Sequence, residues 1–478
     1  MTFIFSMIPE IIILSSLSIV IVADLFLNNN NKYLSYYFLQ IALFVTLSYL
    51  LSMSNNEILI NELYDSSVFS IYVKIFLILL LIIVFSYSYS YLKNFEKYKS
   101  EYFMIIIFGL LGMMIMVSSN HLLLLYLGIE LLSLALYTII AYNKDSLYSA
   151  EAAVKYYVLG AMSSGFLLFG ISLIYGLTGT LLYDDIVNQI TSMNIDSTQY
   201  SINSIGLIFA LTFILISIAF KFGAAPFHMW LPDVYQGSLT PTTLMLSTIP
   251  KVAIFIVMIK LTNSIFSDLE IFWSEMVLIL SVFSILVGNL IAIVQTNIKR
   301  LLAYSTIANV GFILLGIYTG PTYGYSAALF YTITYTLFTT AVFGLLCELK
   351  IDKSPIENIK DLSGLNYKYP SLAVLFLVIM LSMIGIPPFL GFYAKFYIIQ
   401  SLIMENHINL AVFAVIMTVI GSFYYLRVIK VIYFDELDDK IISISSHLIS
   451  YVLVLSLVII GLFPNILSSL AFYSIKNL

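Results

Sequence analysis

Residues 221–241 read KFGAAPFHMWLPDVYQGSLTP, a stretch that follows one long apolar segment and precedes another. It begins with a lysine, and Gly223, Pro226 and Pro232 interrupt any continuous helix. We expect a broken half-helix attached to the preceding segment and not a spanning helix. A helix break at membrane depth is tolerated only where protein buries it or where it lines a water-filled cavity. The stretch therefore predicts a membrane protein with a polar interior.

The composition excludes a soluble globular enzyme. The 478 residues are 61% hydrophobic and 10% charged, whereas soluble chains are about 45–50% apolar and about 25% charged. The single cysteine, Cys347, excludes a disulfide framework, a thiolate zinc site or an iron–sulfur cluster made by this chain alone. The four histidines lack metal-ligand spacing, and no basic patch supports nucleic-acid binding.

Long apolar runs with short polar breaks predict an all-α polytopic membrane protein with about 14 transmembrane helices, since one crossing takes about 20 residues. The apolar start has no basic leader and carries Glu10 and Asp24, so we expect it to be a retained first helix and not a cleaved signal. The predicted helices are 8–27, 33–52, 67–91, 102–119, 122–142, 150–177, 203–222, 242–262, 273–295, 301–319, 324–348, 371–403, 408–433 and 447–472.

The basic residues give this arrangement an orientation. With the N-terminus outside, the loops after odd-numbered helices face inside, and these loops with their helix ends hold fourteen lysines and arginines against two on the other side. Such a bias is typical of membrane proteins. The loops near 53–66 and 182–200, on the outside, are acidic. The inside group is Lys32, Lys93, Lys97, Lys99, Lys144, Lys299, Arg300, Lys350, Lys353, Lys360, Lys368, Arg427, Lys430 and Lys440, and the outside group is Lys260 and Lys476.

The remaining five lysines and one glutamate fall inside predicted helices. A charge at mid-bilayer costs about 2.5–3.5 kcal/mol, so it needs a partner or water. Lys74 and Lys155 lie close enough to helix ends to reach the surface. The other four have no such escape, which favours an ion pathway over structural pairing. They are Glu130, Lys221, Lys251 and Lys395.

These residue types suit proton transfer. Burial favours the neutral amine of a lysine, whereas a nearby carboxylate favours the ammonium, so moving the carboxylate loads or unloads a proton. Glu130 with Lys155 or Lys221 is a candidate pair of this kind. His228 follows Lys221 by seven residues and is a candidate relay, although a lone buried histidine is more often only hydrogen-bonded.

A second break lies in GIPPFLGFYAKF, where Gly385, Pro387, Pro388 and Gly391 precede Lys395. Corresponding breaks in two halves are the sign of transporters built from inverted repeats. We therefore expect two inverted repeats with broken helices. The predicted division is 1–100 for three N-terminal helices, 101–262 and 263–435 for the two antiporter-like halves, and 436–478 for a C-terminal helix.

Four stretches together resemble the antiporter-like subunits of respiratory complex I: EAAVKYYVLGAMSSGFLLFGISLIYGLTGT (151–180), the opening stretch, QTNIKRLLAYSTIANVGFILLG (295–316) and GIPPFLGFYAKFYI (385–398). The first and third look most like the chain 2 family of NADH-ubiquinone oxidoreductase, called subunit N in bacteria. A lysine at 395, where one large antiporter-like subunit carries a glutamate, and the absence of a long lateral helix after the last segment argue against the two others. The first three helices make this the full-length form of the family.

The resemblance implies roles for six residues. Glu130 corresponds to the family's fifth-helix glutamate and Lys221 to its seventh-helix lysine, the pair thought to control proton loading. Lys155 matches the sixth-helix lysine near that glutamate. His228 and Lys251 match the central relay, and Lys395 matches the second-half lysine linked to the exit side. Lys74 matches no motif of the family.

The resemblance also implies a proton-translocating subunit of NADH:ubiquinone reductase with no redox chemistry of its own. No cofactor is expected in this chain, because NADH, FMN, iron–sulfur clusters and ubiquinone are used by other subunits of the complex. The expected partners are other membrane-arm subunits, including neighbouring antiporter-like subunits, and membrane lipids. The expected location is the mitochondrial inner membrane or, alternatively, the bacterial cytoplasmic membrane.

Three other functions stay open at this point. A subunit of an Mrp-type cation/proton antiporter would use the same residues and would require sodium. A structural membrane subunit would tolerate neutral substitutions at Lys221 and Glu130. A solute transporter with a mid-membrane site fits less well, because a chain of lysines and carboxylates suits protons better than a bulky solute.

Overall fold

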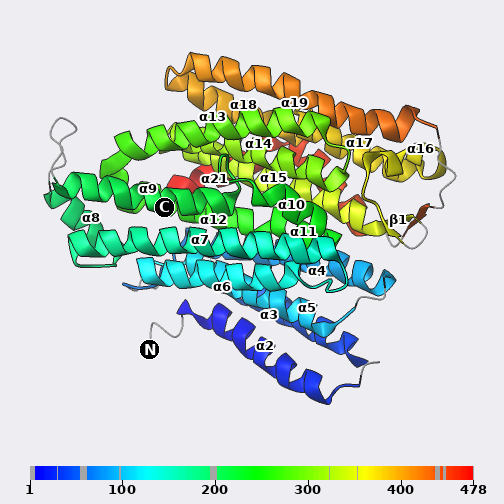
Figure 1. The fold of residues 1–478 in the computed structure, drawn as a ribbon, viewed down its shortest axis with the longest axis horizontal. Helices are drawn as coiled ribbons and strands as arrows, with labels where there is room; N and C mark the ends of the chain where they lie inside the picture. The colour runs from blue at the N-terminus through cyan, green and yellow to red at the C-terminus, as the bar shows by residue number, and fades with distance from the viewer. Residues whose placement is uncertain are drawn as a thin grey trace.

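The computed structural model describes residues 6–28, 31–53, 62–95, 98–193, 202–321, 323–351, 354–436, 442–444 and 448–476. In this part of the chain the helices lie side by side, with α2 (Ile8–Phe26) at one edge and α19 (Ile408–Phe434) at the opposite edge (Figure 1). Twelve of the described helices are long and apolar enough to cross a membrane, or thirteen when the bent pair α20 (Leu448–Leu462) and α21 (Pro464–Lys476) counts as one span. The chain is a multi-pass, helical membrane protein.

The N-terminal part and the first half contain most of the uninterrupted helices. After α2 these are α3 (Tyr33–Met53), α4 (Val68–Asn94), α5 (Ser100–Val117), α6 (Leu122–Ile140), α7 (Leu147–Thr178), α8 (Tyr183–Ser192) and α9 (Ile202–Phe222), followed by the shorter α10 (Trp230–Gly237), α11 (Thr240–Ser247), α12 (Ile249–Lys260), the π-helix η2 (Leu261–Ile265) and the 3₁₀-helix η3 (Ser267–Leu269).

The second half adds long helices, one broken helix and a small sheet. Its elements are α13 (Glu270–Val294), α14 (Ile298–Tyr318), α15 (Tyr323–Glu348), β1 (Leu349–Ile351), β2 (Ser354–Pro355), η4 (Ile359–Leu362), α16 (Leu365–Lys368), α17 (Pro370–Ile384), α18 (Leu390–Met404), α19 and β3 (Ile442–Ile444). β1 pairs antiparallel with β2 and with β3, so that Lys350 lies opposite Pro355 and Ser443.

The core surrounds α12, α14 and α15. Every residue of α12 is buried, as are most residues of α14 and α15. In contrast α2, α3, α7 and α19 expose many leucine, isoleucine, valine and aromatic side chains. Lipid tails are as apolar as leucine, so an outward apolar face carries no penalty in a membrane. The buried polar residues are therefore the informative part of the interior.

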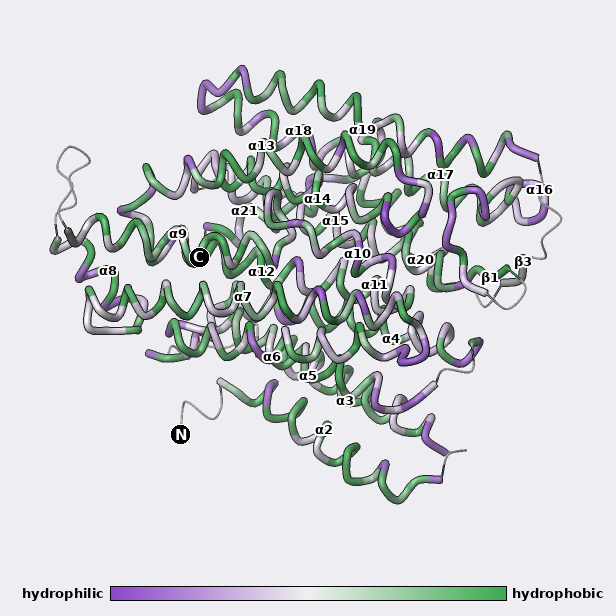
Figure 2. Tube along the Cα trace, in the orientation of Figure 1, coloured by the Kyte–Doolittle hydropathy of each residue, from purple (hydrophilic) through white to green (hydrophobic). Residues whose placement is uncertain are grey.

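The two ends of the bundle differ, as the basic residues predict. The connection from α2 to α3 lies at the same end as β1 and α16, whereas α8 lies at the other end (Figure 1). Figure 2 shows many hydrophilic segments at the end with α16 and β3. The Lys350 Nζ donates to the Asn94 carbonyl oxygen at 3.3 Å, which joins two loops that the prediction placed inside. Lys97, Lys353 and Lys440 lie outside the described residues.

Three predicted helices differ from the structure. Segment 447–472 is two helices bent by 82°, because a proline at 464 cannot continue α20. Segment 242–262 is broken at Thr248 and continues as a π-helix past Lys260. Segment 371–403 is divided into α17 and α18 at the break expected before Lys395. The short helix α8 and the three-stranded sheet were not predicted, and the proposed division of the chain into four parts stays a prediction.

Candidate functional site

The two interrupted helices end in the same way. α9 and α17 are each followed at once by a glycine with positive φ, Gly223 at 81° and Gly385 at 90°. This conformation is costly for a residue with a Cβ atom. In both places a proline follows three residues later, Pro226 and Pro388. The last carbonyl groups of a helix have no partner inside it and form its negative end. At each break, carbonyl oxygens at the end of the helix are therefore available inside the protein as hydrogen-bond acceptors.

A lysine ammonium group occupies each of these carbonyl ends. Lys251, buried on α12, donates its Nζ to the Phe222 carbonyl oxygen at 2.7 Å and approaches that of Lys221 at 3.5 Å. Lys395, on α18, donates its Nζ to the carbonyl oxygens of Ile384 at 2.8 Å and Met383 at 3.1 Å. Neither ammonium has an acidic partner within the salt-bridge distance among the described residues. Backbone carbonyl dipoles, and not carboxylates, thus bind both ammonium groups.

Aromatic rings cover the two ammonium groups. The Lys251 Nζ lies 5.3 Å from the centre of the Trp230 ring, and the Lys395 Nζ lies 5.7 Å from that of Phe312. The Trp230 ring is fixed in turn, since its Nε1 donates to the Phe220 carbonyl oxygen at 2.9 Å. A ring face attracts a cation but accepts no proton. These contacts therefore stabilise the ammonium groups without accepting a proton from them.

Lys221 of α9 contacts α6 one helical turn from Glu130. The Lys221 Nζ donates to the Ser133 hydroxyl at 2.6 Å, and the Glu130 Oε2 accepts from the Ser164 hydroxyl of α7 at 2.7 Å. Ser133 follows Glu130 by three residues and therefore shares its face of α6. The structure brings the predicted glutamate and lysine together without a direct ion pair between them.

Lys155 lies elsewhere. Its Nζ is 2.7 Å from both Asp233 of α10 and Glu151 of its own helix, and 43% of its side chain is exposed. The carboxylates that the Lys155 Nζ contacts are therefore those of Asp233 and Glu151 and not that of Glu130, and the role implied for Lys155 stays a prediction. Lys155 pairs instead across the break that follows α9.

Asp233 of α10 joins α7 to α14. It accepts from the Lys155 Nζ at 2.7 Å and from the Arg300 Nη1 of α14 at 2.6 Å. Burial would raise the pKa of the Asp233 carboxyl, but the hydrogen bonds from Lys155 and Arg300 outweigh burial and hold it below its usual value. A cavity of about 150 Å³ lies beside this cluster. The carboxylate thus stays charged and fixes α10, which follows His228.

A row of polar side chains lies along α14 and α15. The Tyr335 hydroxyl donates to the Thr306 hydroxyl at 2.8 Å, and the Tyr331 hydroxyl donates to the Asn309 Oδ1 at 2.7 Å. The Tyr331 ring stacks on the Phe312 ring, 5.9 Å between centres, and Phe312 is the ring beneath Lys395. This row therefore leads along α14 and α15 towards Lys395.

His228 lies beside α14, one of the two helices that carry the row. It belongs to the turn between α9 and α10, and its ring meets the Tyr304 ring of α14 edge-on, with 6.5 Å between centres. The imidazole is half-buried. His228 thus lies between the break that ends α9 and α14. This position agrees with the relay role that the resemblance implies, and that role stays a prediction.

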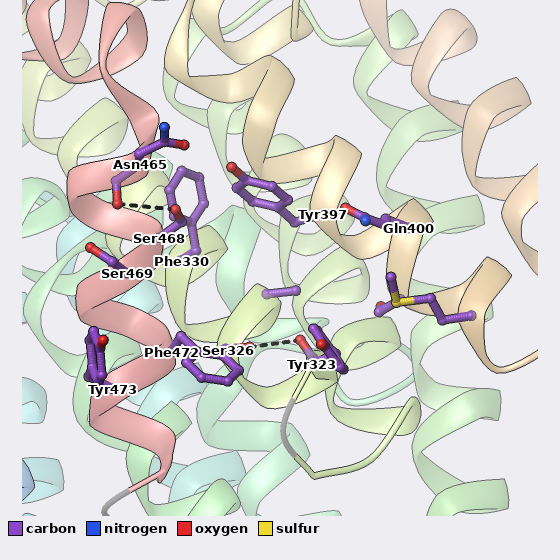
Figure 3. A pocket seen from close by; sticks show the side chains of 13 residues that line it. Tyr323, Ser326, Phe330, Tyr397, Gln400, Asn465, Ser468, Ser469, Phe472 and Tyr473 are labelled. Atoms are coloured by element: carbon purple, nitrogen blue, oxygen red, sulfur yellow. Dashed lines mark hydrogen bonds between the residues drawn. The ribbon is translucent and has the colours of Figure 1, made fainter.

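A further cavity of about 470 Å³ opens between α15, α18 and α21 (Figure 3). Its lining carries no charge and consists of hydroxyl, amide and aromatic side chains with one alanine and one methionine. Tyr397 and Gln400 line it from α18, two and five residues beyond Lys395. The cavity thus lies beside α18, the helix that carries Lys395.

The described residues contain no group of three or more His, Cys, Asp or Glu side chains that could hold a metal ion. The expectation that the chain itself binds no cofactor stays a prediction.

Comparison with known proteins gives the family. The family described as "NADH:quinone oxidoreductase/Mrp antiporter, TM" matches residues 119–421. NADH-quinone oxidoreductase subunit N of Ruthia magnifica subsp. Calyptogena magnifica is 42% identical over 468 residues, 97% of this chain and 96% of the relative. The chain belongs to the subunit N family. The subunit N of Hydrogenovibrio crunogenus is also 42% identical, over 98% of both chains. The predicted choice of subunit N among the antiporter-like subunits is confirmed.

Solved structures share the fold of this chain. A chain of respiratory complex I from Thermus thermophilus superposes with a TM-score of 0.81 at 27% identity, over 96% of this chain and 98% of that one. A chain of the Mrp complex from Dietzia sp. reaches 0.84 at 20% identity, over 99% and 97%. At that identity the Mrp likeness shows a shared fold alone. The predicted antiporter-like fold is confirmed.

Sequence reasoning missed the partners of the subunit N lysines. Ser133, Ser164, Asn309 and Tyr331 contact site residues or continue the row, and none was singled out. Their signal is spacing: Ser133 repeats Glu130 at i+3, and Thr306 with Asn309 recurs at i+3 within an apolar helix. The carbonyl partners of Lys251 and Lys395 leave no such signal.

Proposed function

We propose that this chain is a proton-translocating membrane-arm subunit of an NADH-quinone oxidoreductase. Protons would cross it along Glu130, Lys221, His228, Lys251 and Lys395, while electrons pass from NADH to quinone in other subunits. FMN, iron–sulfur clusters and ubiquinone would be held by those subunits and not by this chain. As a component of that complex it would belong to an NADH:ubiquinone reductase without performing redox chemistry.

The observation that carries the proposal is the repeated pairing of a lysine ammonium with the carbonyl end of a broken helix. Lys251 and Lys395 each face such an end, at 2.7 Å and 2.8 Å. A buried ammonium held by dipoles alone, without a counter-ion, loses its proton at less cost than one in a salt bridge. Static packing would be better served by a paired or apolar residue at these positions.

The first half supplies a switch. The Lys221 ammonium binds Ser133, one turn of α6 from Glu130, close enough for the carboxylate to stabilise the ammonium but without a direct contact. A charge that moves in a neighbouring subunit would displace or neutralise Glu130, and Lys221 would then release its proton towards Lys251. The backbone carbonyl oxygen of Lys221 lies 3.5 Å from the Lys251 Nζ, so Lys251 contacts the end of the helix that carries Lys221.

The polar row would carry the proton between the halves. Tyrosine and threonine hydroxyls donate and accept hydrogen bonds at once, as proton exchange requires. The pairs Tyr335–Thr306 and Tyr331–Asn309 lie on facing helices α15 and α14. Together with His228 they would link Lys251 to Lys395.

The neighbours of the chain would be other membrane-arm subunits and lipids, packed against the apolar outer faces of α2, α7 and α19. The similar subunits are bacterial, which favours the bacterial cytoplasmic membrane over the mitochondrial inner membrane.

A native gel of membranes in mild detergent tests membership of the complex. We expect the chain to migrate in a band of many subunits that oxidises NADH. Migration apart from that activity, alone or with a few small membrane proteins, would contradict the proposal. It would favour the Mrp-type antiporter, for which sodium-dependent proton exchange is the next assay.

A further inference from the structure

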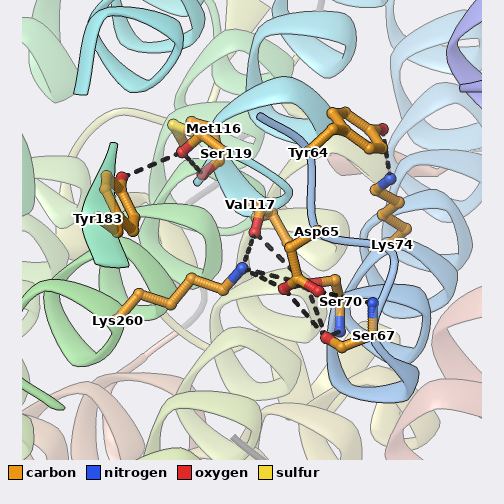
Figure 4. A network of polar contacts seen from close by, with 10 residues as sticks. All are labelled: Tyr64, Asp65, Ser67, Ser70, Lys74, Met116, Val117, Ser119, Tyr183 and Lys260. Atoms are coloured by element: carbon orange, nitrogen blue, oxygen red, sulfur yellow. Dashed lines mark hydrogen bonds and ion pairs between the residues drawn. The ribbon is translucent and has the colours of Figure 1, made fainter. Parts of the chain in front are cut away.

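A buried ion pair joins the N-terminal helices to the helix that carries Lys251. The Lys260 Nζ lies 2.6 Å from the Asp65 Oδ2, although these residues are 195 positions apart in the chain (Figure 4). Lys260 is the last residue of α12, and Asp65 lies three residues before Val68, where α4 begins. The side chains are 9% and 15% exposed. The pair is therefore largely removed from solvent.

Both partners are saturated with hydrogen bonds. The Lys260 Nζ also donates to the Val117 carbonyl oxygen at 2.6 Å and to the Ser70 hydroxyl at 3.2 Å, so each of its three N–H bonds has an acceptor. The Asp65 carboxylate also accepts from the Ser67 backbone N–H at 2.7 Å and from the Ser70 hydroxyl at 2.7 Å. An ammonium bound in this way suits a fixed joint better than a proton carrier.

The loop that carries Asp65 is itself fixed. The Asp65 backbone N–H donates to the Ser118 carbonyl oxygen at 2.7 Å, and the Asn120 N–H donates to that of Leu63 at 3.1 Å. Next to it the Lys74 Nζ donates to the Tyr64 hydroxyl at 2.7 Å (Figure 4). Lys74 also forms a buried ion pair with Glu10 of α2, at 2.8 Å. The loop thus presents Asp65 to α12 from a base formed by α2, α4 and α5.

α12 is a short rod with a lysine near each end. It is interrupted before Ile249, where Thr248 has non-helical angles of φ −113° and ψ −87°, and it changes to a π-helix after Lys260. Because neither end continues as an α-helix, tertiary contacts must set its depth and rotation. Lys251 and Lys260 are nine residues apart, about 14 Å along the rod. A shift at the Lys260 end is therefore transmitted to Lys251.

We propose that Asp65 and Lys260 are positioning residues, which hold α12 so that the Lys251 ammonium stays on the carbonyl end of α9. The inference rests on the proposed function. It gives the three N-terminal helices a part in proton translocation, through one ion pair, although none of them carries a residue of the proton path.

The test uses the assembled complex in inverted membrane vesicles and the double variant Asp65→Asn with Lys260→Met. Removing both charges leaves no unpaired buried ion, a change that proteins often tolerate in stability. We expect assembly and uncoupled NADH oxidation to be retained. We expect protons pumped per NADH to fall towards the level of Lys251→Met, and the pH profile of pumping to shift, which a purely structural contact would not cause.

Asp24→Asn is the matched control. Asp24 accepts from the Ser35 hydroxyl at 2.9 Å and the Ser100 hydroxyl at 2.8 Å, so it also ties N-terminal helices to α5 but does not contact α12. It should pump like the parent. A double variant that pumps with the parental ratio and pH profile overturns the inference. Loss of assembly in the double variant, with normal assembly of Asp24→Asn, also overturns it, because the pair would then maintain the fold and not the position of Lys251.

The same experiment separates this inference from the function on which it rests. If Lys251→Met pumps normally, the proposed proton path is wrong and the inference falls with it. If Lys251→Met loses pumping while the double variant does not, the path stands and only the positioning role is overturned.

Discussion

The Lys395 Nζ lies 2.8 Å from the carbonyl oxygen of Ile384, and so occupies the end of α17 as Lys251 occupies the end of α9. Lys395 lies on α18, the helix directly after the break that ends α17. Lys251 lies on α12, which comes after α10 and α11 and not directly after the break that ends α9. The likeness is therefore one of geometry: a cation at a helix C-terminus, where the dipole is negative. Such a site stabilises a proton without binding it permanently.

The glycine at the second break should resist substitution. Gly385 has φ 90°, and a Cβ there would lie 3.2 Å from the Lys395 Cδ. We expect Gly385→Ala to cost about 1–2 kcal/mol in backbone strain and to lower protons pumped per NADH by displacing Lys395. Gly176→Ala in α7 is the control, because a Cβ there meets no atom within 4 Å. Equal pumping by the two variants would show that the break does not need glycine.

The Ser133 hydroxyl should matter for Lys221. Ser133→Ala removes the acceptor 2.6 Å from the Lys221 Nζ, which should withdraw about 1–3 kcal/mol of stabilisation from the buried ammonium. We expect assembly to persist and pumping to fall and to change its pH profile. The control is Ser18→Ala, an exposed serine that bonds only the Leu14 carbonyl of its own helix. An unchanged pH profile in Ser133→Ala would argue that Lys221 is not part of the path.

The Tyr331 hydroxyl should matter more than its ring. Tyr331→Phe keeps the stacking on Phe312 at 5.9 Å but loses the hydrogen bond to Asn309. We therefore expect normal assembly, normal uncoupled NADH oxidation and fewer protons per NADH. Tyr175→Phe, at an exposed position of α7, should leave the ratio unchanged. A normal ratio in Tyr331→Phe would remove this hydroxyl from the path.

The ion pairs of Asp233 with Lys155 and Arg300 should contribute a stability that does not change with pH near neutrality. Burial raises the pKa of Asp233, but the hydrogen bonds from Lys155 and Arg300 outweigh burial, so the pKa lies below its usual value. Its contribution is thus complete above the usual carboxyl pKa of about 4 and is lost only as pH falls through the lowered value. Because the group is 30% exposed, Asp233→Asn should cost no more than about 1 kcal/mol.

The measurement is the thermal inactivation of the purified complex, parent against Asp233→Asn, across pH 6–8. The difference between the two should stay constant over that range. A difference that titrates between pH 6 and 8 would mean that another group controls the cluster.

The buried lysines and the helix breaks could be predicted from the sequence, because charged residues and helix breakers are unexpected within an apolar helix. Lys221, Lys251 and Lys395 are visible as charges inside spans, and Gly223 and Gly385 as breakers beside them. Their acceptors are backbone carbonyls, which every residue has, so only the tertiary structure identifies Phe222 and Ile384. Lys260 was assigned to a helix end, correctly, but nothing in the sequence points to Asp65, 195 positions away.

Two features of the structure were not predicted, for different reasons. The bend of 82° between α20 and α21 could have been predicted from Pro464, because a proline ends the helix before it. The place of Lys155 could not, because its choice between Glu130 and Asp233 depends on how α10 folds back after the break. That path is set by packing and not by local sequence.

The most direct test is the number of protons pumped per NADH oxidised by inverted vesicles that contain Lys251→Met or Lys395→Met. Lys144→Met, at an exposed position of the loop after α6, is the control. We expect both buried variants to assemble and to oxidise NADH when uncoupled, yet to pump fewer protons than the parent and the control. Parental pumping by assembled Lys251→Met and Lys395→Met would contradict the proposed proton path.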